Sequence, residues 1–131
     1  MFDGNYIEMV ETKTAKIYLK DDILFLIYKQ KAEIGIDEIE ENLEKRIELQ
    51  ENKKMLTFVD VREVWEYSSE ARALVGGDKF KAITTAMAVV VGYSLPVKIV
   101  ANFFMKINKP NYPTKLFKKE KSAIKWLNSF K

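Results

Sequence analysis

The stretch that decides the fold is residues 54–74, KMLTFVDVREVWEYSSEARAL. It opens with the apolar run 55–59, which ends at Asp60, and it continues through a short polar link to Ser68 and Ser69. After these serines the spacing of apolar residues predicts a helix. A strand that is apolar on both sides is typical of the centre of a sheet covered by helices. The loop after its carboxyl end is where α/β sheets place ligands or partner contacts, so a functional site is sought here first.

The chain before this stretch predicts a hairpin and a helix. Residues 6–11 are expected to form a first edge strand or an irregular lead-in. Residues 14–20 and 23–28 are expected to form an antiparallel hairpin that turns at Asp21-Asp22. A helix is expected over 35–50. Its expected N-cap is Asp37 with Glu40 completing a capping box, and its expected apolar stripe is Ile36, Ile39, Leu43 and Ile47.

The chain after this stretch alternates again between strands and helices. Strands are expected at 86–91 and 114–117, a short helix at 78–84, and longer helices at 94–109 and 119–130. The apolar runs 55–61 and 86–91 are predicted to be parallel neighbours, because a helical crossover joins them. The predicted fold class is therefore α/β: one domain over residues 1–131, with a mixed β-sheet flanked by about four helices and an N-terminal β-hairpin.

The composition excludes several kinds of chemistry. The 131 residues contain no cysteine and no histidine, and the net charge is only +3. Disulfides, thiol nucleophiles, histidine-based catalysis and histidine zinc sites are therefore absent. We expect no enzyme, no cofactor and no metal. The late lysines are expected to form a solvated face rather than a nucleic-acid site, because no nucleic-acid motif accompanies them.

Location is predicted from two further features. The apolar stretch 86–105 has Lys98 as its single charge, but Gly92, Ser94 and Pro96 interrupt it. We therefore expect a strand, a turn and a helix there, and no membrane span. The first residues lack the basic start and apolar core of a signal peptide. A cytoplasmic protein is expected.

The order of elements, with Phe58-Val59-Asp60-Val61 leading through a link into Ser68-Ser69 and a helix, resembles the STAS domains and their SpoIIAA-like relatives. The segments Asn102-Phe103-Phe104, Asn108-Lys109-Pro110 and 113–117 look like uncharacterised bacterial proteins of this type. In the anti-sigma-factor antagonists of that group, the loop ends in Asp-Ser-Ser-Gly, and a partner kinase phosphorylates a serine there. Aligned without gaps, Ser69 takes the phosphorylated position. The family's aspartate falls on Ser68, its second serine on Glu70 and its glycine on Ala71.

Each candidate site residue has a structural and a functional interpretation. Ser68 or Ser69 caps the helix, or the pair is a partner contact or phosphorylation switch. Asp60 fixes the turn through loop amides, or it faces a ligand. Trp65 and Tyr67 cover the core, or they form half of an exposed protein-binding patch with Arg62 or Arg72 nearby.

Phe103 and Phe104 lie about 100° apart on the predicted helix. They pack in the core, or one of them faces a groove or a second subunit. We also expect self-association as a homodimer, through the strand at 14–20 or through the helix that carries these phenylalanines.

The leading functional hypothesis is a non-catalytic, STAS-like binding or regulatory module that acts through protein–protein contacts. The alternative is a small-molecule or lipid-binding domain, because SpoIIAA-like folds also resemble SEC14-type lipid carriers. In that case an apolar groove would carry the function.

Overall fold

The computed structural model describes residues 8–92 and 111–131. The strands are β1 (Met9–Glu11), β2 (Ala15–Lys20), β3 (Ile23–Tyr28), β4 (Ala32–Ile34), β5 (Met55–Asp60), β6 (Val64–Tyr67), β7 (Thr84–Val90) and β8 (Thr114–Phe117). The helices are α1 (Ile36–Gln50), α2 (Ser69–Val75), α3 (Asp78–Lys81) and α5 (Glu120–Asn128). The predicted mixed α/β architecture is confirmed.

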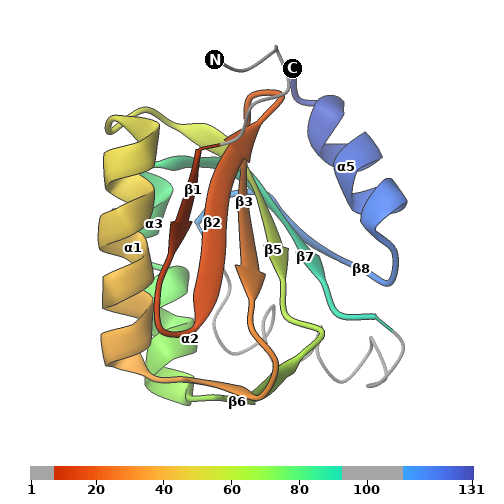
Figure 1. Cartoon of the computed structure of the whole chain (residues 1–131). Coiled ribbons are helices and arrows are strands. Elements are labelled where there is room, and N and C mark those ends of the chain that lie inside the picture. Colours follow the sequence, from red (N-terminus) through yellow and green to blue (C-terminus); the bar gives the residue numbers. More distant parts are fainter. Residues whose placement is uncertain (1–7, 93–110) are drawn as a thin grey trace.

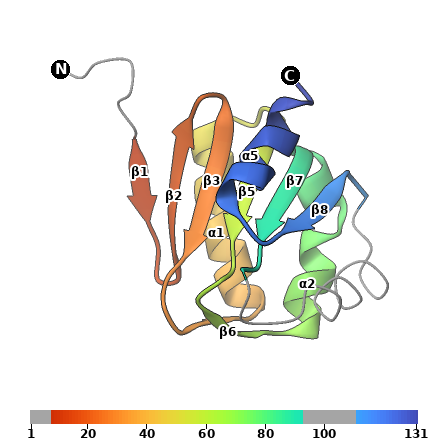
Figure 2. The same cartoon turned by 90° about the vertical axis from the view of Figure 1, so that its right-hand side faces the viewer.

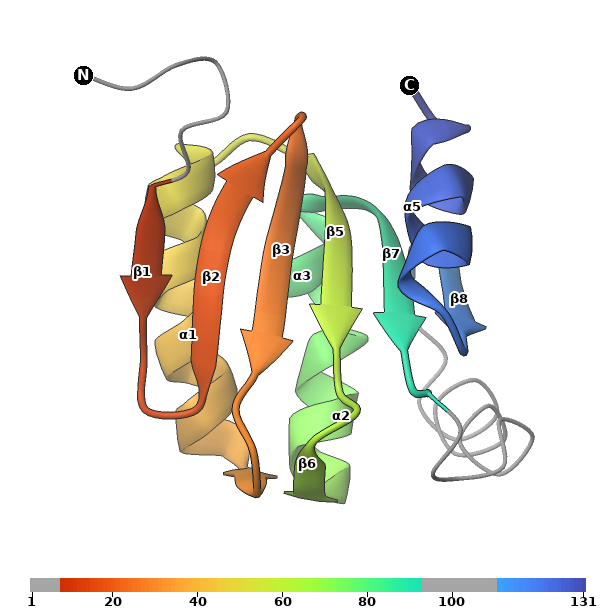
Figure 3. The same ribbon diagram turned by 45° about the vertical axis from the view of Figure 1, so that its right-hand side comes forward.

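Six strands form the main sheet in the order β1-β2-β3-β5-β7-β8, which can be followed in Figure 3. β1, β2 and β3 are antiparallel neighbours, whereas β3, β5, β7 and β8 are parallel. The predicted hairpin is confirmed, and Asp21 and Asp22 make its turn with φ values of 52° and 65°. Positive φ at both central residues matches the twist of the strands on either side. The predicted parallel pairing of the two apolar runs, now β5 and β7, is also confirmed.

The helices form two layers of unequal size. α1, α2 and α3 lie on one face of the sheet, and α5 lies on the other face, against β5 and β7 (Figures 1 and 2). The side chains of β3 show why its sequence is apolar throughout. Leu24 and Leu26 belong to the core under α1, while Ile23 and Phe25 belong to the core under α5. Because α5 is short, the β2–β3 side of its face has little helical cover, which positions the groove described below.

A second, two-stranded parallel sheet was not predicted. β4 pairs with β6 at the end of the molecule where β3 and β5 terminate (Figure 3). Each strand has only three or four residues, so neither shows a periodic pattern long enough to read from sequence. The polar link predicted after Asp60 is therefore largely a strand.

The predicted start of the first helix is corrected in detail. Gly35, not Asp37, is the N-cap of α1, and Glu38, not Glu40, reaches back to the cap, with its Oε1 accepting from the Gly35 amide at 2.8 Å. The stripe is also shifted, because Ile36 is 44% exposed. The buried face of α1 consists of Ile39, Asn42, Leu43, Arg46 and Gln50.

The helices that follow β6 were the subject of the remaining expectations. Ser68, one of the two serines offered as the cap, is the cap of α2, and the adjacent glycines Gly76 and Gly77 separate α2 from α3. The helix expected over 94–109, with Phe103 and Phe104, lies outside the described residues. Across the two described ranges, no helix has both the length and the apolar character needed to cross a membrane.

Candidate functional site

The loop after β5 is fixed by the carboxylate of Asp60, which is buried at the end of the strand. Its Oδ1 accepts a hydrogen bond from the backbone amide of Arg62 at 3.0 Å, and its Oδ2 accepts one from Nη2 of the same arginine at 2.5 Å. The neighbouring carboxylate raises the pKa of the Arg62 guanidinium. Asp60 therefore has the turn-fixing geometry that was the structural interpretation of this residue.

Arg62 extends this interaction to another layer of the fold. Its Nη2 also donates to Glu120 Oε1, at the first residue of α5, at 2.7 Å. The aliphatic part of its side chain crosses Gly92, where a Cβ would lie 3.0 Å from Arg62 Cγ and where φ is +67°. Only glycine adopts this conformation at little cost. Arg62 thus links the loop after β5 to α5. Its side chain can take this path because position 92 is a glycine, which has no Cβ to clash with it.

The two serines have different surroundings. Ser68 Oγ accepts a hydrogen bond from the Ala71 amide at 3.1 Å, and the Ser68 amide donates to the Ile34 carbonyl at 2.9 Å. Ser69 is exposed, and its Oγ donates to Glu70 Oε1 at 3.2 Å. Ser68 is therefore the helix cap, whereas Ser69 presents its hydroxyl to solvent.

The two aromatic residues of β6 separate in the same way. Tyr67 packs edge-on against Tyr28, with ring centroids 6.3 Å apart, and burial raises the pKa of Tyr67 well above its usual value. Trp65 is 69% exposed, and Lys31 Nζ lies 5.3 Å from the centre of its ring. Tyr67 thus covers the core and Trp65 is exposed.

The register of the small sheet explains this exposure. Ala32 pairs with Val64 and Glu33 pairs with Glu66, so Trp65 is an extra residue between two successive pairs. Such a bulge re-aims the side chain of the extra residue and is over-represented next to functional sites. Because Val64 and Glu66 on either side are both paired with β4, Trp65 itself has no paired residue on β4.

The small two-stranded sheet that carries this tryptophan also exposes charged residues. The exposed residues on or beside β4 and β6, here called the β6 surface, are Lys31, Glu33, Glu63, Trp65, Glu66, Ser69 and Glu70. Four of these seven are acidic. The arginines expected to contribute are engaged elsewhere: Arg62 binds Asp60 and Glu120, and Arg72 is buried and donates to the Tyr67 carbonyl. The surface is therefore mainly acidic, with one exposed indole.

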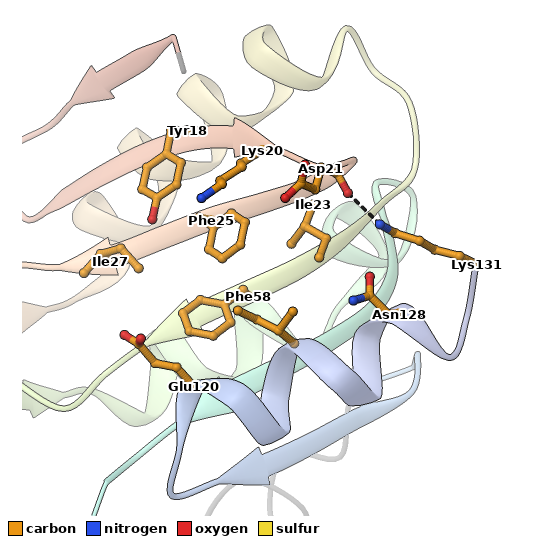
Figure 4. Close-up of a pocket in the computed structure, with 11 residues that line it drawn as sticks. Tyr18, Lys20, Asp21, Ile23, Phe25, Ile27, Phe58, Glu120, Asn128 and Lys131 are labelled. Atoms are coloured by element: carbon orange, nitrogen blue, oxygen red, sulfur yellow. Dashed lines mark hydrogen bonds between the residues drawn. The ribbon is translucent and has the colours of Figure 1, made fainter. Parts of the chain in front are cut away.

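A groove lies on the other face of the sheet, between α5 and the β2–β3 hairpin (Figure 4). Its volume is about 530 Å³. The aromatic rings of Tyr18, Phe25 and Phe58 line it in sequence, with centroids of neighbouring rings 5.0 Å apart. Its polar rim comprises Lys20, Asp21, Glu120, Asn128 and Lys131. Sequence analysis did not locate this groove, because strand residues and a distant helix form it together.

Within residues 8–92 and 111–131, no group of three or more acidic side chains is placed to hold a metal ion. The one close Asp60–Arg62–Glu120 cluster is an ion-pair network in which each charge has a partner. It positions the loop after β5 against the start of α5.

Comparison with known proteins assigns the family. The family described as "Domain of unknown function (DUF7793)" matches residues 17–131, and the chain belongs to it. No curated protein matches the sequence. A similar solved structure is that of an uncharacterized protein of the DUF3478 family with a SpoIIAA-like fold, from Shewanella loihica PV-4. It is 18% identical, with a TM-score of 0.55, and the match covers 97% of this chain and 99% of that one. The resemblance to SpoIIAA-like domains is thereby confirmed as one of fold.

Proposed function

We propose that this chain is a non-catalytic binding or regulatory module of the cytoplasm, and that it recognises a protein partner through the β6 surface. The observation that carries the proposal is the bulge that holds Trp65 69% exposed at the end of the sheet. Tryptophan is strongly enriched among the residues that dominate binding energy at protein interfaces. The SpoIIAA-like fold, which is associated with such modules, supports the same proposal.

The charge of the β6 surface specifies the partner's chemistry. Four of its seven residues are acidic, and Glu33 and Glu66 are direct neighbours across the small sheet. Like charges at such close range repel each other, and a basic partner would relieve that repulsion. The partner we propose therefore presents a basic surface with an apolar pocket for the Trp65 ring.

The test is photo-crosslinking in the cells that make the protein. A photoreactive phenylalanine analogue replaces Trp65 in one variant and Phe130 in a control variant; Phe130 is 39% exposed at the opposite end of the chain's fold. The proposal predicts one dominant cross-linked protein with a basic surface, formed from position 65 and not from position 130. Equal, diffuse cross-linking from both positions would contradict it.

The groove under α5 supports a second candidate, a small-molecule carrier. Ligand pockets have volumes of roughly 300–1,000 Å³ and combine apolar walls with a few polar groups, and this groove meets both criteria. The proposed ligand has an aromatic or aliphatic body over Phe25 and Phe58 and an anionic group beside Lys20. Native mass spectrometry of protein purified from its own cells would show a bound ligand, and Phe25→Ala would release it. A ligand-free mass for both proteins would exclude this candidate.

A further inference from the structure

The helix face of α1 that packs on the sheet contains an unusual polar row. Asn42, Arg46 and Gln50 follow one another at intervals of four residues, and each is no more than 2% exposed. Arg46 is the largest of the fully buried side chains in the described parts of the chain. A guanidinium is costly to bury unless its charge is compensated.

The hydrogen-bond acceptors around Arg46 are all neutral. Nε donates to Gln50 Oε1 at 2.7 Å, and Nη2 donates to the hydroxyl oxygens of Thr57 at 2.7 Å and Thr84 at 3.1 Å. The Phe80 ring lies 5.7 Å from the guanidinium carbon. These groups satisfy donors, but they do not supply a negative charge.

No carboxylate among the described residues forms an ion pair with Arg46. The printed sequence leaves only one acidic side chain outside the described ranges, Asp3. Burial lowers the pKa of the Arg46 guanidinium to about 10, so it still carries its charge at neutral pH. The chain thus contains a buried cation whose counter-charge the described residues do not provide.

A small cavity adjoins this cation. It has a volume of about 30 Å³ and lies between α1, α2 and the sheet, with Arg46, Tyr28, Asn42 and Tyr67 as its polar lining and apolar side chains around the rest. The hydrogen bonds of Arg46 named above come from Nε and Nη2, to one residue of α1 and two threonines of the sheet. Burial raises the pKa of Tyr28 to about 12, so its hydroxyl keeps a proton to donate. The space suits an occupant of about the size of one water molecule.

We propose that this cavity binds a monatomic anion, chloride in the cell, as the counter-ion of Arg46. A water molecule would fill the same space and accept a hydrogen bond, but it would leave the charge uncompensated. A halide supplies both functions, and its lack of hydrogen-bond donors suits a cavity whose remaining walls are apolar. Polyatomic anions such as phosphate are too large for the space.

The first measurement is the melting temperature at constant ionic strength, with sodium gluconate replaced stepwise by sodium chloride or bromide. A ligand that binds only the folded state raises the melting temperature saturably, here by about 4 °C at ten times its dissociation constant. Arg62→Met is the matched control, because this partly exposed arginine has carboxylate partners. It should keep the whole response, while Arg46→Met should lose it. An unchanged melting temperature of the wild-type protein would overturn the proposal.

The second measurement does not depend on whether Arg46→Met folds. Crystals of the unmodified chain grown in bromide should give an anomalous peak inside the cavity, within about 3.5 Å of the Arg46 guanidinium. Density for water with no anomalous signal at that place would overturn the proposal.

Discussion

Ser68 and Ser69 differ in what their hydroxyls contact, and the difference gives a first prediction. Ser68→Ala removes the acceptor for the Ala71 amide and should lower the free energy of unfolding by about 1 kcal/mol. Ser69→Ala should change it by less than about 0.5 kcal/mol, because its exposed hydroxyl bonds only to Glu70. Ser69→Asp should be neutral or slightly stabilising at a helix N-terminus. Urea denaturation of the four proteins measures these values.

The same variants test the switch that the resemblance implies for Ser69. If a charge there regulates binding, Ser69→Asp should alter the capture of the partner while Ser69→Ala leaves it intact. Ser68→Ala is the control for an indirect effect through the helix. Identical capture by all variants would leave Ser69 as an ordinary exposed residue at the start of α2.

For single residues, the sequence indicated which side chains matter better than it indicated what surrounds them. Apolar runs and capping residues are local signals, which is why a turn-fixing role for Asp60 and a capping role for Ser68 or Ser69 were among the interpretations offered. The choice between Trp65 and Tyr67 could not be made, because it depends on a register offset against a strand thirty residues earlier. The burial of Arg46 was not predicted, since a charged residue is almost never buried without a partner. Its spacing from Ile39, Asn42 and Gln50 on one helix face was the available signal.

The Asp60–Arg62–Glu120 network joins elements, and its removal should loosen one of them. Arg62→Met keeps the packing over Gly92 but removes both ion pairs. We expect faster amide hydrogen exchange in α5, with less than about 1 kcal/mol lost in global stability, because the arginine is 39% exposed and solvent screens its charge. Lys45→Met is the control, since the exposed Lys45–Glu48 pair contacts no second element. Unchanged exchange in α5 would show that the helix is held by Ala123 and Leu127 alone.

Long elements could be predicted and short ones could not. β3 and β8 have their predicted bounds, and β5 and β7 lie where the apolar runs indicated. β3, β5 and β7 are buried on both faces of the sheet, and such burial appears in the sequence as an uninterrupted apolar run. β4 and β6 depend on each other for their hydrogen bonds and carry no local pattern. The last helix is also shorter than predicted, and Phe130 falls beyond its end with 39% of its surface exposed.

The whole molecule should lose stability in strong alkali. Burial raises the pKa of Tyr28 to about 12, and it also raises those of Tyr67 and Tyr112 above their usual value of about 10. Below pH 10 the neutral forms of these tyrosines make their full contribution to folding stability. That contribution is lost as the pH rises through the folded-state pKa values. Arg46 acts in the opposite direction, since its lowered pKa makes folding less costly above about pH 10. We expect the stability lost from three tyrosines in alkali to exceed the stability gained from one arginine.

Absorbance at 295 nm checks this pH dependence. The three buried tyrosines should remain un-ionised until the circular dichroism signal of the fold is lost, and both changes should occur together above about pH 11. Tyr28→Phe should move the transition to higher pH, because it removes one of the ionisable groups. Gradual ionisation of all tyrosines near pH 10 with the fold intact would contradict the burial described for them.

Self-association is a further prediction for the whole molecule. β2 is paired on both sides, so an edge-to-edge contact of the hairpin would use β1, whose outer edge is free of any described strand. Met9 on this strand is 52% exposed. We expect a two-fold dimer through β1, measurable by light scattering at tens of micromolar, and we expect Met9→Pro to abolish it by removing a backbone donor from the outer edge. A monomer at every concentration would contradict the prediction.

The central claim is that Trp65 carries recognition of a protein partner, and the dissociation constant of that partner tests it most directly. With the cross-linked protein purified, calorimetry should show binding weakened about 30-fold or more by Trp65→Ala, as expected for about 2 kcal/mol at an interface hot spot. Phe130→Ala should bind within about two-fold of wild type, and both variants should melt like it, because neither side chain is buried. Binding by Trp65→Ala that is indistinguishable from wild type would contradict the account.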